Sequence, residues 1–291
     1  MRVFVQTRGT ARAADYAFLG GAPPEPWWRA YRDVTAFDHP TVLVASDGAR
    51  WASYLSGVPS SRVDAVGTVV RWTLVLDGPC GAPDAACVPA AVGAWLDDVA
   101  AGAGPGGRLA AALDARLPAA EIERWQSVPD ERPVRPTGSD ERHSRTDQGS
   151  AEVRSRVLAA LASLPAPAYA SDEPGDWIGA VAAPAPRAAF LARVASLVDG
   201  SPGRALLLNL VDGPPEAQPL LDPASPVAVL VESTDLQLAR CSALRPVVEA
   251  KKAPAPRATV AAMGIAALPL VALFGTLAMT ALVVTLLFWL L

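Results

Sequence analysis

The residues best suited to chemistry flank a short apolar run, residues 41–45. Four side chains with acid–base or nucleophilic character stand beside it: Asp38, His39, Ser46 and Asp47. A serine that loses its proton to a nearby histidine is a standard route to nucleophilic catalysis. We therefore consider His39 as a general base for Ser46. The alternative is ordinary turn chemistry, because Pro40 restricts the backbone of His39.

The same turn is a candidate ligand site. We predict a strand over 41–45 and a short helix over Ala49–Ser56, so the turn would join a strand end to a helix start. Anions bind at such places. The candidate ligand-binding residues are Arg8, Ser46, Asp47 and Gly48. The alternative is a plain turn, in which Asp47 caps the helix and Gly48 relaxes the backbone.

No sequence motif indicates a cofactor. The chain contains no G-x-G-x-x-G, G-x-x-x-x-G-K-[ST], H-E-x-x-H, G-x-S-x-G or C-x-x-C, and these motifs accompany nucleotide binding, zinc proteolysis and serine hydrolysis. The three cysteines are Cys80, Cys87 and Cys241. They have neither the spacing nor the neighbouring histidines of a zinc site. We expect reduced thiols, no metal and no cofactor.

Several elements must position these residues. Strands are predicted where valine and leucine runs are bounded by Gly, Pro or Asp, at 2–6, 41–45, 69–76, 205–211 and 227–231. Helical spacing of apolar residues predicts further helices at 88–99, 109–117, 153–164 and 186–198. An aromatic cluster, Trp27, Trp28 and Tyr31, is expected on another short helix, either as core or as a partner surface. The mixture predicts an α/β or α+β soluble part with a mixed sheet.

The order of segments predicts two α/β parts. Residues 127–150 are rich in both charge signs and in proline and lack Leu, Ile, Phe, Trp and Tyr. Such a segment buries little apolar area, so we predict a linker or long loop there. It divides an N-terminal part, 1–126, from a second part, 151–250. Each part has only two or three clear strands. The alternative is that the strands of both parts belong to one sheet.

The C-terminal segment predicts a membrane anchor. Residues 258–291 contain no Asp, Glu, Lys, Arg or His, and Pro269 divides them. Leu270–Leu291 is long enough for one crossing, since about 20 apolar residues span the hydrocarbon core. A short basic tether, 251–257, precedes the segment with Lys251, Lys252 and Arg257. By the positive-inside rule this flank, and the N-terminus with it, is cytoplasmic.

The predicted crossing also carries a stripe of small residues. The residues that we single out in the anchor are Leu270, Ala272, Thr276, Thr280 and Trp289. Small side chains every four residues allow close helix packing, which favours self-association. Trp289 suits the far membrane interface. The N-terminal apolar stretch is too short for a signal peptide, so we expect a single-pass, tail-anchored protein.

These features favour a protein that works through partners. A net charge of −4 and an isoelectric point of 5.3 exclude an extended basic surface for nucleic acid. The expected partners are the lipid bilayer and other proteins or further copies of the chain. We predict a non-enzymatic scaffold, adaptor or effector, and one hypothesis places it, as a membrane-perturbing protein, in a bacterial stress or defence system. The alternatives are a membrane-tethered enzyme that uses the loop around Asp38–Asp47, or an anion or nucleotide sensor.

Overall fold

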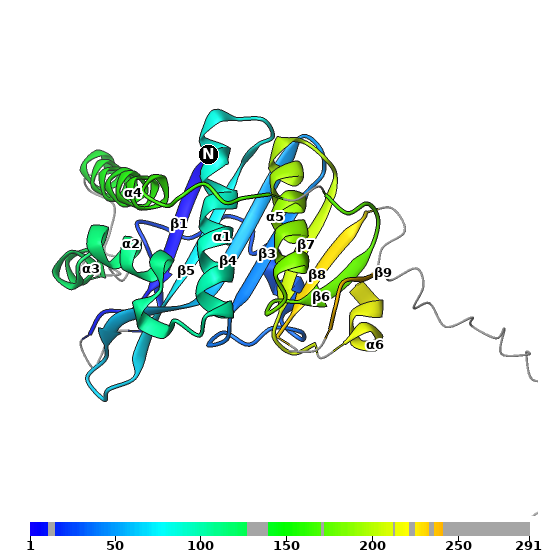
Figure 1. The fold of residues 1–291 in the computed structure, drawn as a ribbon. Helices are drawn as coiled ribbons and strands as arrows, with labels where there is room; N and C mark the ends of the chain where they lie inside the picture. Colours follow the sequence, from blue (N-terminus) through cyan, green and yellow to red (C-terminus); the bar gives the residue numbers. More distant parts are fainter. Residues whose placement is uncertain are drawn as a thin grey trace, which may run out of the picture. The chain divides into compact units, whose positions relative to one another are not determined.

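The computed structural model describes residues 1–10, 15–126, 139–169, 172–211, 213–220, 225–232 and 236–240, with side chains omitted over 139–148 and at Gln218. All of them lie in one compact unit, Met1–Pro246. They form an α/β domain around a nine-stranded mixed sheet of order β2-β1-β5-β4-β3-β7-β8-β6-β9 (Figure 1). The predicted α/β architecture with a mixed sheet is confirmed for this part of the chain.

One half of the sheet is antiparallel. Its strands are β1 (Arg2–Thr7), β2 (Ala17–Leu19), β3 (Thr41–Ser46), β4 (Arg50–Val63) and β5 (Val69–Pro79). The strands β3, β4 and β5 follow one another as hairpins, and β5 also pairs with β1. Every residue of β3 except Ala45 is buried, as expected for a strand covered on both faces.

The other half is mostly parallel. It contains β6 (Trp177–Ala180), β7 (Gly203–Leu208), β8 (Val227–Val231) and the short edge strand β9 (Ala239–Arg240). Helix α5 (Pro184–Asp199) connects β6 to β7, and both strands run parallel to β8. The two halves join where β3 pairs antiparallel with β7, from Val42 opposite Leu207 to Ser46 opposite Gly203. Strands from 1–126 and from 151–250 therefore share one sheet.

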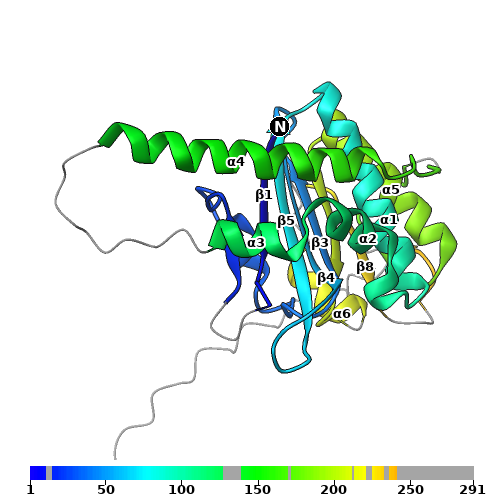
Figure 2. The same ribbon diagram turned by 90° about the vertical axis from the view of Figure 1, so that its left-hand side faces the viewer.

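Helices cover one face of the sheet, as Figures 1 and 2 show. They are α1 (Cys87–Ala100), α2 (Arg108–Arg116), α4 (Ser139–Ala162) and α5, with α3 (Ala119–Gln126) beside α4. Their apolar faces, including Leu96, Leu113 and Phe190, pack on Leu55, Leu74 and Leu207 of the sheet; all six are fully buried. Non-directional burial of this apolar surface is the main source of stability.

Shorter segments cover the other face. The 3-10 helix η1 (Trp27–Tyr31) packs there, and Trp28 stacks on Tyr54 of β4 with ring centroids 5.2 Å apart. The short helices α6 (Pro214–Ala217) and η4 (Gln218–Leu220) lie near the parallel half. Two further 3-10 turns are η2 (Pro83–Ala86) and η3 (Gly104–Gly106). The predicted aromatic cluster is thus part of a second, smaller core.

The helix predicted over Ala49–Ser56 is wrong, because Arg50–Ser56 begin β4 and Ala49 lies in the turn before it. Ser46 lies opposite Trp51 in the β3–β4 pair, so the chain reverses over Asp47–Arg50. Local propensity gives only a weak strand signal here, since residues 50–56 contain no β-branched side chain and only Trp51 and Tyr54 are strand-favouring aromatic residues. Hydrogen bonding on both edges, to β3 and to β5, decides the conformation instead.

The linker predicted over 127–150 is contradicted for residues 139–150, which belong to α4. Three buried residues further along this helix, Val153, Val157 and Leu161, hold it against the core. A helix fixed at one end extends at little cost into a polar segment, because Glu, Arg and Gln are good helix formers. The composition of this segment therefore did not distinguish a loop from a helix.

The predicted membrane anchor, 258–291, lies outside the described residues, as do Lys251, Lys252 and Arg257 of the tether. Of the helices that the structure does describe, none has both the length and the apolar character needed to cross a bilayer. The crossing at Leu270–Leu291 stays a prediction.

Candidate functional site

The turn that sequence analysis singled out is a β-hairpin turn. The N–H of Asp47 donates to the carbonyl of Arg50 over 3.1 Å. The carboxylate of Asp47 accepts the backbone N–H groups of Arg50 at 2.7 Å and Ala49 at 2.8 Å. These two bonds lower the pKa of Asp47 below its ordinary value. Gly48 adopts a φ of +93°, which favours glycine. The carboxylate thus holds its own turn.

The candidate catalytic residues fall into two separate places. Asp38 and His39 precede β3, and their side chains are exposed and 4.0 Å apart. Ser46 ends the same strand, where its hydroxyl accepts the N–H of Gly48 at 3.1 Å. A strand of this length separates its ends by about 20 Å, at about 3.3 Å per residue. His39 therefore lies beyond reach of Ser46, and the structure does not assemble the proposed pair.

Arg8 also lies apart from the hairpin turn. Its guanidinium is 3.1 Å from the carboxylate of Asp64, in the turn between β4 and β5. It lies 5.9 Å from the ring centroid of Tyr16. The four predicted ligand-binding residues therefore divide as well, with Ser46, Asp47 and Gly48 at one place and Arg8 at another.

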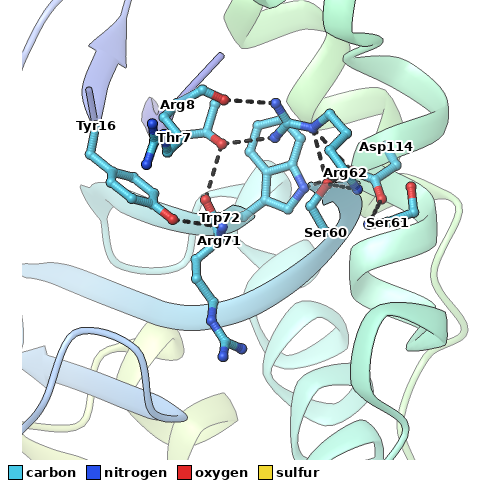
Figure 3. A network of polar contacts seen from close by, with 9 residues as sticks. All are labelled: Thr7, Arg8, Tyr16, Ser60, Ser61, Arg62, Arg71, Trp72 and Asp114. Carbon is cyan, nitrogen blue, oxygen red and sulfur yellow. Dashed lines mark hydrogen bonds and ion pairs between the residues drawn. The ribbon is translucent and has the colours of Figure 1, made fainter. Parts of the chain in front are cut away.

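Arg8 borders a dense polar cluster, the Arg62 network (Figure 3). Its members are Thr7, Arg8, Tyr16, Ser60, Ser61, Arg62, Arg71, Trp72 and Asp114. The Arg62 side chain is only 9% exposed. It donates from Nη1 to the carbonyl of Arg8 at 2.9 Å, from Nη2 to Thr7 at 2.8 Å and from Nε to Ser60 at 3.0 Å. All three nitrogens of this guanidinium are used.

Asp114 on α2 completes the Arg62 network. Its carboxylate accepts the hydroxyl of Ser60 at 2.6 Å, the indole N–H of Trp72 at 2.9 Å and the backbone N–H of Ser61 at 2.6 Å. The guanidinium of Arg62 stacks over the ring of Trp72, 4.4 Å from its centroid. Satisfied contacts of this kind tie α2 to β4 and β5. We assign the network a structural role.

A cleft of about 820 Å³ opens beside the β3–β4 turn. We call it the Arg204 cleft. It lies between the loop that leads into η1 and the start of β7, and its polar lining consists of Arg2, Glu25, Trp27, Ser46, Asp47, Arg50, Asp77, Arg204 and Ser225. Its apolar lining includes Pro23, Pro24 and Val75. The volume falls within the range of small-molecule sites, about 300–1,000 Å³.

The acidic groups at the floor of the cleft already have partners. Asp77 accepts Nε of Arg2 at 2.7 Å and Nη2 of Arg50 at 3.3 Å, and Asp47 accepts two backbone N–H groups. Two guanidinium groups thus share the single carboxylate of Asp77. The net charge of Arg2, Arg50 and Asp77 together is therefore +1.

Two donors in the cleft have no partner within the described residues. The guanidinium of Arg204 donates from Nη2 to the carbonyl of Leu220 at 2.9 Å, but its Nε is buried and unpaired. The indole Nε1 of Trp27 is buried and unpaired too. Both groups can only donate. The unmet hydrogen-bonding capacity of the cleft therefore calls for an acceptor.

Sequence reasoning missed most of this site. Arg2 and Asp77 lie opposite each other in the β1–β5 pair. Because the two residues are far apart in the sequence, no local pattern predicts that they meet. Arg204 is the second residue of an otherwise apolar strand, Gly203–Leu208, and a charge at that position was the one available signal. No group of three or more His, Cys, Asp or Glu side chains forms a metal site within the described part of the chain.

Comparisons with known proteins leave the site to be judged on its own geometry. No family model matches the chain, and neither a curated protein nor a solved structure matches it. A fold by itself does not fix a function, whereas a site of defined chemistry constrains one. The Arg204 cleft, with its unpaired donors, is accordingly the feature on which a function can be argued.

Proposed function

We propose that this chain is a membrane-tethered, non-enzymatic sensor or adaptor whose α/β domain binds a small ligand in the Arg204 cleft. One observation carries the proposal: Arg204 and Trp27 line the same open cleft, and each carries a buried donor that has no partner among the described residues. A buried donor left unpaired costs about 1–3 kcal/mol. A ligand that supplied acceptors would remove this cost.

Position distinguishes these donors from others in the domain. Among the described residues, Arg8, Trp125 and Arg193 also carry a buried donor without a partner, and none of the three lines the Arg204 cleft. The indole N–H groups of Trp95 and Trp177 are likewise buried and unpaired in this part of the chain. Both belong to the packed core between helices and sheet, where neighbouring side chains fill the space. Arg204 and Trp27 instead border a cleft. Concave sites with a few converging polar groups on apolar walls are typical of ligand binding.

The tethering half of the proposal comes from the sequence. Residues 258–291 carry no ionisable side chain, and Lys251, Lys252 and Arg257 precede them. A single crossing at Leu270–Leu291 would keep the ligand-binding domain at the cytoplasmic surface. Ligand binding would then be signalled to protein partners or to further copies of the chain at that membrane.

An enzyme built on the loop around Asp38–Asp47 is not supported. That mechanism needs a histidine within hydrogen-bond reach of the nucleophile. Strand β3 separates His39 from Ser46, and Asp47 is engaged by its own turn.

A ligand screen on the full chain tests the proposal. The protein is placed in phosphatidylcholine nanodiscs, and thermal unfolding is followed by tryptophan fluorescence with anionic, cationic and neutral small molecules. A ligand at 100 times its Kd stabilises the folded state by about 2.7 kcal/mol. We expect at least one compound to stabilise wild type and the Arg32→Gln control, since Arg32 is exposed and outside the cleft. The absence of stabilisation by every charge class would refute ligand binding.

Membrane attachment is tested separately by liposome flotation. We expect the full chain to float with liposomes and a chain lacking residues 258–291 to remain at the bottom of the gradient. Equal behaviour of the two chains would contradict the tether without bearing on the cleft.

A further inference from the structure

We propose that the ligand of the Arg204 cleft carries a phosphate group bound by Arg204, while Arg2 and Arg50 contribute positive charge from the other side of the cleft. This inference rests on the proposed function and names the chemistry of its ligand. It follows from which hydrogen-bonding groups of the cleft are committed to the protein and which are not.

The uncommitted groups are donors. Nε of Arg204 and Nε1 of Trp27 are buried without a partner in the part of the chain that the structure describes, and neither can accept a hydrogen bond. An amine or guanidinium ligand would bring more donors to a place that needs acceptors. Phosphate oxygens bear charge and accept several hydrogen bonds at once, and charge-assisted bonds to them are about twice as strong as neutral ones.

Two further guanidinium groups stand at the other side of the cleft. Arg2 and Arg50 are 55% and 56% exposed and share the carboxylate of Asp77. Each guanidinium has five N–H donors in a planar fork, and Asp77 engages one nitrogen of each. Asp77 leaves the remaining donors of both groups unengaged, and the carboxylate of Asp47 adds an electrostatic attraction to Arg50. Planar forks of this kind match the geometry of phosphate.

The carboxylates of the lining limit how tightly a bare ion would bind. Glu25, Asp47 and Asp77 together balance the three arginines of the lining, so its formal charge is zero. A phosphate alone would also fill little of a cleft of about 820 Å³. The apolar wall of Pro23, Pro24 and Trp27 offers contact for a larger body. The geometry therefore favours a phosphate ester over inorganic phosphate.

Two sources supply this chemistry at a membrane surface. One is a soluble phosphate ester, and the other is the phosphate of an anionic lipid headgroup in the bilayer to which residues 258–291 would tether the domain. Both present the same charged oxygens to Arg204. The experiment therefore carries one arm for each source.

The test uses the full chain in nanodiscs and three probes that differ in charge: phenyl phosphate, benzylamine and benzyl alcohol. Hydrogen exchange of backbone amides in 20–27, 45–52 and 203–206 reports occupancy of the cleft, and calorimetry gives the affinity. We expect phenyl phosphate to slow exchange in these segments. We expect Arg204→Gln to weaken its binding about 10- to 100-fold, because a hydrogen bond to a charged group contributes about 1.5–3 kcal/mol.

Trp27→Phe keeps the aromatic ring and removes the donor, so we expect about a 5-fold loss from one neutral donor. It also keeps the test valid if Arg204→Gln fails to fold, and Arg32→Gln is the matched control that should bind as wild type does. Slower exchange in phosphatidylglycerol nanodiscs than in phosphatidylcholine nanodiscs would identify the headgroup as the source. Protection by phenyl phosphate with no difference between the two lipids would identify a soluble ester.

Three results would overturn the inference. They are tighter binding of benzylamine or benzyl alcohol than of phenyl phosphate, unchanged phenyl phosphate affinity in both Arg204→Gln and Trp27→Phe, and no protection by any probe or lipid. The first of these would leave the proposed function intact, since the cleft would still bind a ligand. A ligand screen without any stabilising compound would refute both.

Discussion

The Arg62 network and the Arg204 cleft both place arginines beside tryptophans and aspartates, but the donors of Arg62 and Trp72 are paired, whereas those of Arg204 and Trp27 are not. At the edge of the network, Nε of Arg8 is also buried without a partner among the described residues. In the network, every nitrogen of the Arg62 guanidinium donates to an oxygen of the protein, and the indole of Trp72 donates to Asp114. In the cleft, Nε of Arg204 and the indole of Trp27 have no partner among the described residues. The same residue types therefore hold the fold together in the network and leave donors unpaired in the cleft.

This difference teaches where to look for function when sequence motifs are missing. A satisfied buried network holds elements together, and removing a member leaves the others unpaired. An unsatisfied buried donor on a side chain that lines a cleft contributes little to the fold, and a small movement of that side chain would let a ligand supply its acceptor. The following predictions use stability and binding to separate the two regions.

The largest effect is expected from Asp114→Ala in the Arg62 network. Three donors lose their acceptor, so we expect the free energy of unfolding to fall by about 3 kcal/mol. For a domain of this size the midpoint falls by about 6–12 °C. Asp97→Ala is the control, because its contact with Arg108 is a half-exposed surface pair worth less than about 1 kcal/mol. Equal losses in the two variants would contradict a structural role for the network.

Arg204→Gln should behave in the opposite way. Among the described residues the side chain makes one hydrogen bond, to the carbonyl of Leu220, and glutamine retains a donor. We expect a loss of less than about 1.5 kcal/mol in the ligand-free protein, together with the loss of ligand-induced stabilisation. Thermal unfolding with and without phenyl phosphate measures both quantities. If Arg204→Gln lowered the free energy of unfolding as much as Asp114→Ala does, Arg204 would have a structural role like that of the Arg62 network, which would contradict the account.

Low pH should reduce the stability that Asp64 provides in the turn between β4 and β5, beside the Arg62 network. Its carboxylate accepts the N–H groups of Thr68 and Val66 and pairs with Arg8, and these contacts, led by the Thr68 amide, lower its pKa from 3.8. Because the folded-state pKa is the lower one, this stabilisation is present above about pH 4 and is lost as the pH falls through the folded-state value. Urea unfolding should show wild type more stable than Asp64→Asn at pH 7, with the gap shrinking below pH 4. A gap that is constant with pH would contradict this.

The smallest effect is expected from Glu25→Gln at the rim of the cleft. Glu25 is exposed, so solvent screens its repulsion of a bound phosphate. We expect phenyl phosphate to bind about 2-fold more tightly, with the difference vanishing at high salt. Calorimetry at low and high ionic strength measures this, and weaker binding in the variant would indicate that Glu25 contacts a positive part of the ligand.

Much of the fold was predictable because burial leaves a local pattern. The apolar runs at 41–45, 205–211 and 227–231 predict β3, β7 and β8, and apolar residues at helical spacing predict α1 and α5. The hairpin strand β4 was missed because its pairing with two neighbours, not its composition, makes it a strand. Short elements such as β6 and β9 carry too few residues for a period to show.

The site was less predictable, because it depends on which residues the sheet places side by side. Ser46 and Asp47 do line the cleft, although the predicted reason, a helix N-terminus, was wrong. Arg204 joins them only because β7 pairs with β3 in the register that sets Ser46 opposite Gly203. No local pattern encodes that register. The membrane anchor at 258–291, by contrast, rests on composition alone and stays a prediction.

Nuclear magnetic resonance of the side-chain N–H groups tests the central claim most directly. The full chain is labelled with ¹⁵N in phosphatidylcholine nanodiscs and titrated with phenyl phosphate. Signals of Arg204 Nε–H and Trp27 Nε1–H are assigned from Arg204→Gln and Trp27→Phe. We predict that both signals shift with the ligand, while those of Arg62 Nε–H and Trp72 Nε1–H stay in place. Stationary signals from the cleft, or equal shifts from the network, would contradict the account.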